Sequence, residues 1–263
     1  MCLVAFQWQP DQPIPLWLLA NRDEFYARPS EPAHRWPGTV PIFAGRDQQA
    51  GGTWMGVGAG GRWGLLTNYR EVPAQTGGPS RGDLICHYLA GNQDARGYLQ
   101  QLQPRAQRYA GFNLLLGDSN GLCYFSNRQG QIHSLSPGVY GLCNHLLDTP
   151  WPKVQRLKQG LQRGLAQGES LSALLALLRD PQPAPDHALP ETGVGLTLER
   201  QLSPIFIHTP QYGTRLSTLW RQDQQGQWDW LEQAFDGDGA MGAPRHHRLS
   251  ADLATRLAPC CPS

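Results

Sequence analysis

The sequence contains no long hydrophobic run. No stretch among its 263 residues approaches the roughly 18 consecutive apolar residues that a membrane-spanning helix needs. The longest early apolar run, at residues 16–20, has no basic segment before it, so it does not fit a signal peptide. We therefore expect a cytoplasmic protein with no membrane span.

Charge is also scarce, and neither sign is clustered. Asp, Glu, Lys and Arg make up 16% of the residues, against a usual share of about 25%, and the formal net charge is +1. Nucleic acids and anionic membranes are bound through basic patches or runs, which this sequence lacks. Neither is an expected partner.

Cysteines are present, but without the spacing of a metal site or of a disulfide framework. The six of them stand at positions 2, 86, 123, 143, 260 and 261, and no CxxC pair occurs. In a reducing compartment we expect free thiols. No metal site is predicted.

What the sequence does contain is a series of short strand patterns separated by turn residues. Residues 2–8 and 15–23 are expected to form a hairpin around the turn-forming residues 9–14. A proline-rich loop is expected at 29–41. The other predicted strands are 42–47, 53–58, 63–69, 111–118, 121–127, 131–135, 138–144, 202–208, 216–220 and 227–232.

Four segments favour helices. Residues 80–89 begin with Ser80 as a possible cap, and 94–103 follow. Residues 151–165 and 170–178 carry apolar side chains at spacings of three and four. Strands, helices and strands again predict one α+β domain, residues 1–263, with helices packed on antiparallel sheets. A loop is expected at 181–190, and the tail from 237 onward carries no clear pattern.

Cys2 directly follows the initiator methionine. If Met1 is removed, the chain begins with a thiol and a free amine on one residue. The thiolate can act as a nucleophile, and the amine, with a reference pKa of about 7.7 to 8.0, can act as its base. The alternative is a buried thiol that packs as a small hydrophobic side chain.

The tetrapeptide Asn21-Arg22-Asp23-Glu24 follows an apolar strand pattern, at a point where it can face the chain start. A carboxylate there could hold the terminal ammonium group, and an arginine could favour the thiolate. The alternative is a charged turn with solvated side chains.

At this point the chain resembles the NRDE family, also called the transport and Golgi organisation protein family. The resemblance rests on ordered blocks along most of the chain: MC at 1, NRDEF at 21, GGTWMGV at 51, TNYRE at 67, SRGDL at 80, NHLLDTPWPKV at 144 and YGTRLST at 212. It implies a four-layer αββα sandwich of two antiparallel sheets flanked by helices. The fold would be similar to the N-terminal nucleophile hydrolases, and closest to their branch of bile salt hydrolases and penicillin V acylases.

The same resemblance implies a set of site residues. In that branch Cys2 would be the nucleophile and Asp23 would hold its amine, while the branch's arginine is Ala20 here. Asn68 and Asn144 would donate hydrogen bonds to an oxyanion, unless they are strand-end or helix caps. Arg215 resembles a late arginine of the branch, or forms a surface salt bridge.

Substrate binding is expected from residues of the tetrapeptide and from neighbouring strands. His145 and His208 are left out, because the mechanism needs no histidine. Trp54 can equally be a core residue. The predicted binding residues are Asn21, Arg22, Glu24, Thr53, Trp54 and Tyr69, with Arg70 beside them.

Three functions fit this interpretation. The first is a hydrolase that cleaves a non-peptide amide or related acyl bond of a small hydrophobic molecule, with no cofactor required. The second, which the resemblance to the family implies, is a carrier or chaperone of haem or of lipid/acyl-coenzyme A in the same cleft, with haem as a bound ligand. The third is a degenerate fold retained for protein partners.

Overall fold

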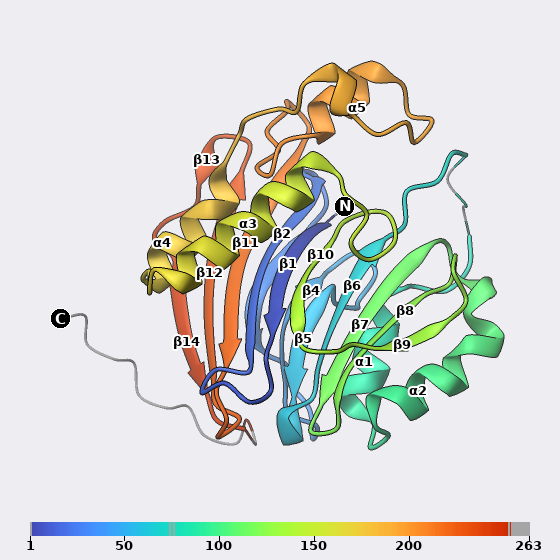
Figure 1. Ribbon diagram of the computed structural model, residues 1–263. Coiled ribbons are helices and arrows are strands. Elements are labelled where there is room, and N and C mark those ends of the chain that lie inside the picture. Colours follow the sequence, from blue (N-terminus) through green and yellow to red (C-terminus); the bar gives the residue numbers. More distant parts are fainter. Residues whose placement is uncertain (1, 74, 76, 252, 254–263) are drawn as a thin grey trace.

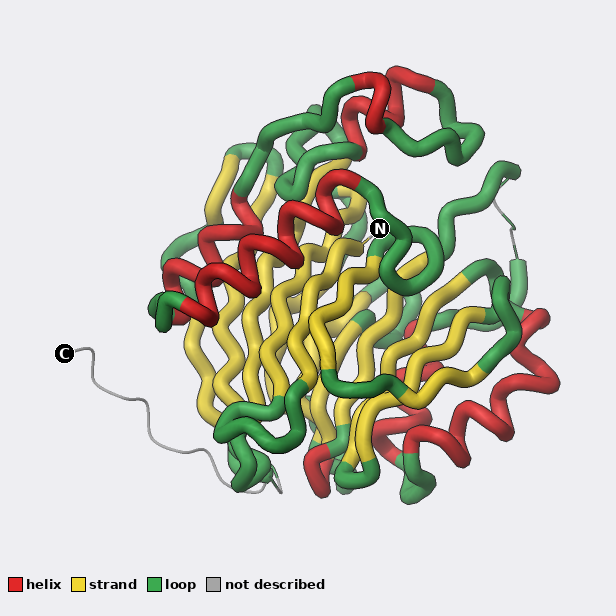
Figure 2. The backbone as a smooth tube through the Cα atoms, in the orientation of Figure 1, coloured by secondary structure: helices red, strands yellow, loops and turns green. Residues whose placement is uncertain are grey.

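The computed structural model describes residues 2–73, 75, 77–251 and 253, with Cys2 described by its backbone alone. Two antiparallel sheets lie face to face, with helices on the outer face of each, as Figure 1 and Figure 2 show. This arrangement confirms the predicted α+β sandwich of four layers. In the described residues, none of the helices is long and apolar enough to cross a membrane.

The first sheet, called sheet A, is formed by strands from the beginning and from the end of the described chain, together with one strand from its middle. Its order is β10-β1-β2-β11-β12-β13, and β14 also pairs with β12. The strands are β1 (Cys2–Trp8), β2 (Leu16–Phe25), β10 (Gly138–Leu142), β11 (Tyr212–Gln222), β12 (Trp228–Asp236), β13 (Gly239–Ala240) and β14 (Arg245–Leu249).

The second sheet, called sheet B, is a meander in which neighbours along the chain are neighbours in space. Short connections join most of these neighbours, whereas a long segment, residues 69–111, joins β6 to β7. The strands are β3 (Ser30–Arg35), β4 (Ile42–Asp47), β5 (Met55–Gly58), β6 (Trp63–Asn68), β7 (Phe112–Asp118), β8 (Gly121–Ser126) and β9 (Ile132–Ser134).

The helices divide between the two outer faces. Apolar side chains of α1 (Gly82–Ala90) and α2 (Ala95–Leu102) join the hydrophobic cluster of sheet B, and those of α3 (Pro152–Ala166) and α4 (Leu171–Ala176) join the cluster of sheet A. The short α5 (Leu196–Leu202) lies beyond the upper strand ends (Figure 1). The 3₁₀ turns are η1 (Ala59–Gly61), η2 (Gln103–Arg108), η3 (Leu177–Arg179) and η4 (Asp186–Ala188).

The core between the sheets follows from the two-residue period of the strands. On β2, Leu18 and Ala20 pack into the inter-sheet cluster, whereas Leu19 packs under the helices. A group of buried tryptophans belongs to the inter-sheet cluster: Trp63, Trp220, Trp228 and Trp230.

The hairpin of β1 and β2 is confirmed, and its register matters for function. Cys2 pairs with Arg22, and Leu3 pairs with Asn21. The start of the chain therefore lies against the charged end of β2.

The prediction of a loop at 29–41 is wrong over its first half, where β3 forms. This strand is at the edge of sheet B and pairs only with β4, so that Pro32 removes no inner ladder bond. The register shifts between Glu31 and His34, beside the proline.

The strand predicted at 202–208 is also wrong. Leu202 ends α5, and the following segment pairs with β11 only through a bridge between His208 and Gly213. Ile205 and Ile207 are buried, but as a loop packed against sheet A. The segment is rich in apolar residues because it is buried, and not because it forms a strand.

Two smaller differences concern the start of the first helix and the segment from residue 237 onward. Ser80 is not the cap of the first helix, because α1 starts at Gly82 after Arg81 and has no side-chain cap bond. The tail that showed no clear pattern supplies β13 and β14, the latter containing His246 and His247.

The cysteines that the structure describes are free. Cys86 is partly buried, and Cys123 and Cys143 are buried. Cys260, Cys261 and the thiol of Cys2 lie outside the described part of the chain.

Candidate functional site

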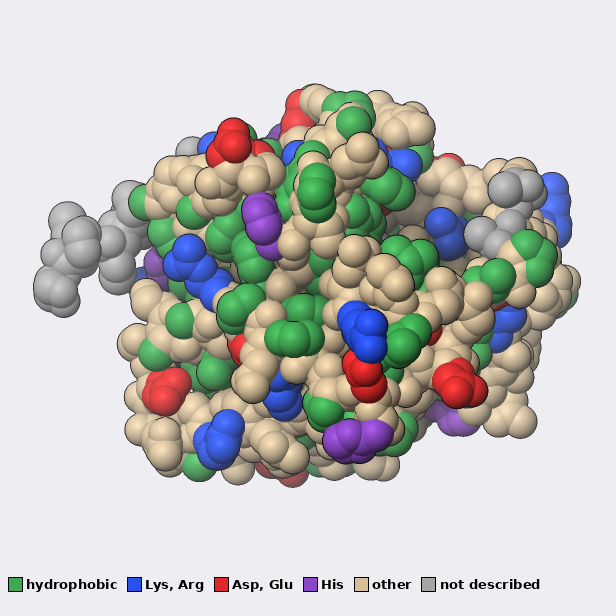
Figure 3. Space-filling model, turned by 90° about the horizontal axis from the view of Figure 1, so that it is seen from above, with side chains coloured by type: hydrophobic (Ala, Val, Ile, Leu, Met, Phe, Trp, Pro, Cys, Tyr) green, Lys and Arg blue, Asp and Glu red, His purple; other side chains and the backbone are tan. Residues whose placement is uncertain are grey.

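A cavity of about 340 Å³ lies at the upper end of the sandwich, between the end of β2 and sheet B. Figure 3 looks onto this end and shows a hollow beside the lobe that carries α5, with basic side chains around it. Arg22, Asp23 and Glu24 of the tetrapeptide border the cavity. Other lining residues come from distant segments: Arg28, Asp47, Gly52, Thr53, Trp54, Leu66, Asn68, Gln75, Arg81 and Gly82.

Arg22 is the most enclosed cation of the cavity, with 6% of its surface exposed. Its guanidinium lies 4.3 Å from the centre of the Trp54 ring, a cation–π contact. Nη2 of Arg22 is 3.8 Å from Oδ2 of Asp47, and Nε of Arg28 is 2.8 Å from the same oxygen. Two arginines therefore share one carboxylate, with Glu24 3.8 Å from Arg28 on the outer side.

Asp23 is almost completely buried, with 1% of its surface exposed. The hydroxyl of Thr214 donates a 2.8 Å hydrogen bond to its Oδ1. Burial raises the pKa of this carboxyl, whereas the charge of Lys153 and the bond from Thr214 act in the opposite direction. The environment of Asp23 therefore decides how much of it is ionised.

Asn21 is directed away from the cavity. Its amide nitrogen donates to the carbonyls of Leu178 (2.9 Å) and Ile205 (2.8 Å), and its Oδ1 accepts a bond from Ser217. These contacts fasten the segments beneath the helix layer to sheet A. Asn21 therefore has a structural role and is not part of the cavity lining.

The two asparagines predicted for the oxyanion occupy different positions. Asn68 ends β6 and lines the cavity. Asn144 is fully buried behind it, and its amide nitrogen donates 2.8 Å to the backbone carbonyl of Asn68. The structure thus brings Asn144 to Asn68 itself, and Asn68 to the cavity.

Arg215 also lies away from the cavity lining. It stands at a bulge of β11, where the register shifts between Thr214 and Leu216. Its Nη1 donates to the carbonyls of Phe25, Tyr26 and Arg28 at 3.0 to 3.1 Å. Arg215 therefore fixes the turn that leads from the tetrapeptide to Arg28.

Thr53 borders the cavity, and its hydroxyl donates to the carbonyl of Met55. Tyr69 packs its ring 5.0 Å from the ring of His145, and burial raises its pKa. Arg70 forms an ion pair with Glu199 at 2.8 Å. Tyr69 and Arg70 lie outside the cavity lining, next to it along the chain.

A close backbone contact positions the start of α1 at the cavity wall. A Cβ added to Gly52 would lie 2.6 Å from the carbonyl carbon of Gly82, which no side-chain movement could relieve. Only glycine permits this approach of the loop before β5 to the first turn of α1. Arg81 is thereby brought to the wall beside them.

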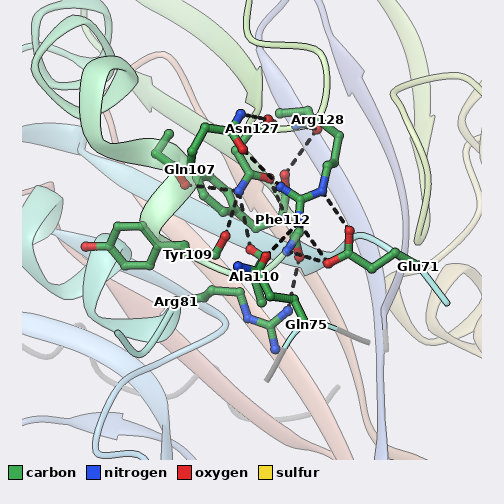
Figure 4. Close-up of polar contacts among 12 residues, drawn as sticks. Glu71, Gln75, Arg81, Gln107, Tyr109, Ala110, Phe112, Asn127 and Arg128 are labelled. Carbon is green, nitrogen blue, oxygen red and sulfur yellow. Dashed lines mark hydrogen bonds and ion pairs between the residues drawn. The ribbon is translucent and has the colours of Figure 1, made fainter. Parts of the chain in front are cut away.

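The same wall is held by a network around Arg128, shown in Figure 4. Arg128 makes a two-point ion pair with Glu71 at 2.7 and 2.8 Å, and it also donates to Gln75. The bond from Arg128 lowers the pKa of Glu71. Arg81 donates to the carbonyl of Gly111 on the same side. This network fixes the segment that contributes Gln75 and Arg81 to the cavity.

Sequence reasoning did not identify Arg28, Asp47 and Arg81 as lining residues, nor a buried polar network below them. In that network Asn113 donates to the hydroxyl of Thr67 (3.0 Å) and to the carbonyl of His145 (2.9 Å), and accepts from the hydroxyl of Tyr124 (2.8 Å). Thr67 donates in turn to the carbonyl of Cys143. The sequence does hold a signal for this network: Thr67, Asn113 and Tyr124 carry polar groups at inward positions of three otherwise apolar strands.

The described residues contain no group of three or more His, Cys, Asp or Glu side chains that could hold a metal ion. The backbone of Cys2, the candidate nucleophile, lies opposite Arg22. Its side chain is outside the described part of the chain.

Fold and site together define an αββα sandwich protein with a charged cavity between the ends of its sheets. The chain belongs to the family described as Transport and Golgi organisation 2, whose model matches residues 1–237. The resemblance drawn from the tetrapeptide and its companion motifs is thereby confirmed.

Relatives cover nearly the whole chain. The mouse protein named Transport and Golgi organization 2 homolog is 34% identical over 258 residues, covering 89% of this chain and 93% of the relative. The human homolog is 33% identical over 259 residues, with the same coverage. The Drosophila melanogaster protein is 27% identical over 270 residues, covering 90% and 93%.

Among solved structures, the chain is similar to the crystal structure of the mutant C2A conjugated bile acid hydrolase from Clostridium perfringens. The TM-score is 0.45 at 8% identity, covering 98% of this chain and 100% of that one. A likeness this distant does not indicate a shared activity.

Proposed function

We propose that this protein is an N-terminal nucleophile hydrolase in which Cys2 attacks a non-peptide amide or other acyl bond. One observation supports this above all: the backbone of Cys2 pairs with Arg22, which lines a charged cavity together with Asp23 and Glu24. This pairing brings the backbone of the chain start to the rim of a cavity that can hold a small substrate.

The reaction needs removal of Met1. The α-amine of Cys2 takes the thiol proton, and the thiolate attacks the carbonyl carbon. The amide of Asn68 donates to the resulting oxyanion, while Asn144 holds Asn68 through its backbone carbonyl. The C–N bond breaks as the leaving amine takes the proton from the α-ammonium, which leaves a thioester.

Water completes the cycle. The α-amine accepts a proton from water as the oxygen attacks the thioester, and returns it to the departing sulfur, so that an acid and the free thiol result. Asp23 is the carboxylate that holds the α-ammonium in each half reaction, and Arg22 favours the thiolate. No cofactor takes part.

The cavity lining favours a substrate with a polar part. Three arginines, Arg22, Arg28 and Arg81, and three carboxylates, Asp23, Glu24 and Asp47, border the cavity, and apolar side chains such as Leu66 are few. A wholly hydrophobic molecule, as the sequence suggested, would have to displace water from these charged groups without replacing its hydrogen bonds.

Protein purified from its natural host should lack Met1 by intact mass. Incubation with 4-nitrophenyl acetate should give a burst of one equivalent of 4-nitrophenol and a single acetyl group on Cys2, because the thioester forms before it is hydrolysed. Cys2→Ala should abolish both, and Cys123→Ala, which removes a thiol of β8 outside the lining of this cavity, should change neither. Retained Met1, or an equal burst from Cys2→Ala, would contradict the proposal.

A second candidate is a non-enzymatic carrier of acyl-coenzyme A, supported by the three arginines that reach one cavity from separate elements. Guanidinium groups pair well with phosphates. Haem is less well supported, since the described lining residues include no histidine, methionine or tyrosine to bind its iron.

For the carrier, titration with palmitoyl-coenzyme A should give saturable binding that Cys2→Ala leaves intact. Arg81→Gln should weaken it about tenfold, the effect of losing one charge-assisted bond of ~1.4 kcal/mol. Arg105→Gln, at an exposed arginine outside the lining, is the matched control. Haem added instead should give no saturable spectral change. Equal affinity in the wild type and Arg81→Gln would count against this candidate.

A further inference from the structure

The lobe that carries α5, residues 189–202, is attached to the molecule with little apolar contact. Within it only Glu199 and Leu202 are buried, while Leu196 and Leu198 of the helix are 50% and 46% exposed. In the described part of the chain, three hydrophobic clusters hold the sheets and the other helices, and no residue of this lobe belongs to them. A helix of seven residues is not stable by itself. Polar contacts therefore hold the lobe in place.

The main polar contact is a buried ion pair. Oε2 of Glu199 accepts a 2.8 Å bond from Nη1 of Arg70, and Oε1 accepts bonds from the backbone N–H and the hydroxyl of Thr192. The side chains of Arg70 and Glu199 are only 7% and 5% exposed. The guanidinium of Arg70 also lies 5.0 Å from the centre of the Trp151 ring. The pair thus joins α5 and the loop before it to the segment that follows β6.

A second polar contact holds the end of α5. Nζ of Lys153 donates 2.7 Å to the backbone carbonyl of Leu202. This bond fixes the point where the chain leaves the lobe, whereas the ion pair fixes the helix and Thr192 in the loop before it. Loss of one member of a buried ion pair leaves the other charge without compensation, so the pair is the contact on which the position of the lobe depends most.

Arg70 is connected to the candidate active site through its backbone. Its N–H donates 2.7 Å to the carbonyl of Asn144. The side chain of Asn144 donates 2.8 Å to the carbonyl of Asn68, which lines the cavity. One residue therefore contacts the lobe with its side chain and the support of Asn68 with its backbone.

We infer that Arg70 is a positioning residue: its side chain fastens the lobe of residues 189–202, and this attachment keeps its backbone against Asn144 and thereby Asn68 in place at the cavity. When the pair is broken, the remaining charge has to reach water, which opens the lobe and releases the backbone at position 70. The effect on catalysis rests on the proposed hydrolase function. The attachment of the lobe does not.

Hydrogen exchange of single amides, followed by NMR, tests the attachment. In Arg70→Met the amide of Glu199 in α5 and the amide at position 70 should both exchange at least about tenfold faster, because both open with the lobe. Arg70→Lys, which keeps the charge, should show a smaller effect. The control is Arg200→Met in the same helix. It breaks an exposed ion pair with Asp186 and should leave both amides unchanged.

Glu199→Gln tests the pair from the lobe side with a side chain of the same shape, and it serves also if Arg70→Met does not fold. The same two amides should exchange faster. In the double variant with Arg70→Met the effect should be smaller than the product of the two single effects, since the two side chains act on each other. Unchanged exchange in both single variants, or a full product in the double variant, overturns the inference.

The catalytic effect is measured on the same proteins as the rate of acetylation by 4-nitrophenyl acetate. In Arg70→Met the limiting rate should fall about tenfold while the half-saturating concentration stays the same, because Arg70 is outside the cavity lining and an oxyanion donor acts in the transition state. Faster exchange with an unchanged acetylation rate overturns the positioning role. A wild-type protein that is not acetylated contradicts the hydrolase, and the exchange data then still decide the attachment of the lobe.

Discussion

Replacing Asn113 with leucine is expected to lower the free energy of unfolding by about 3 kcal/mol or more. The substitution leaves the carbonyl of His145 without its donor and the hydroxyl of Tyr124 without its acceptor, both in a buried layer. Each unsatisfied buried polar group costs about 1 to 3 kcal/mol. Urea denaturation followed by tryptophan fluorescence measures the loss.

The same substitution should also disturb the site. Asn113 and Thr67 hold the carbonyls of His145 and Cys143, and Asn144 lies between them. Asn68, which Asn144 supports, should lose its fixed place at the cavity. Asn120→Leu, in an exposed turn, is the control and should change stability by less than about 0.5 kcal/mol. Equal stability of the two variants would show that the network carries little energy.

Replacing Trp220 with alanine is expected to lower the free energy of unfolding by about 3 to 5 kcal/mol. Trp220 is fully buried in the inter-sheet core, and its ring lies 4.8 to 5.5 Å from the rings of Trp63, Trp228 and Trp230. These side chains belong to different strands of both sheets, so they cannot collapse into the space that an indole leaves. Urea and thermal denaturation should agree on the loss.

Trp17→Ala is the matched control for Trp220→Ala. Trp17 lies on the outer face of sheet A, is only partly buried, and has the guanidinium of Arg221 5.1 Å from its ring. Its removal opens no enclosed cavity and should cost clearly less. If both variants lose the same stability, the packing of the inter-sheet layer is not the dominant contribution assigned to it here.

Local patterns were sufficient for most of the elements. The two-residue alternation at 2–8 and 15–23 predicted the hairpin, and helical spacing at 151–165 predicted α3. These local patterns failed where the place of a segment in the fold, at the edge of a sheet or under a neighbouring element, determined its structure. Pro32 argued for a loop, but an edge strand tolerates it, and the apolar residues at 202–208 are buried without pairing.

The predicted site separated into two groups. Arg22, Asp23, Glu24, Thr53, Trp54 and Asn68 border one cavity. Asn21, Asn144 and Arg215 direct their polar groups at backbone carbonyls, and so fix the elements that carry the first group. No local pattern distinguishes an amide that faces a cavity from one that faces a carbonyl 184 residues away, as Asn21 does.

The sequence by itself determined the family, the class of fold and the pairing of the chain start with the NRDE strand, since these follow from motifs and from alternation along a few residues. Only the tertiary structure decided that Arg28, Asp47 and Arg81 share a cavity with Arg22. These residues stand on segments that the two sheets and α1 bring together. Their positions depend on how the layers pack against each other, and the order of residues along one strand does not determine that packing.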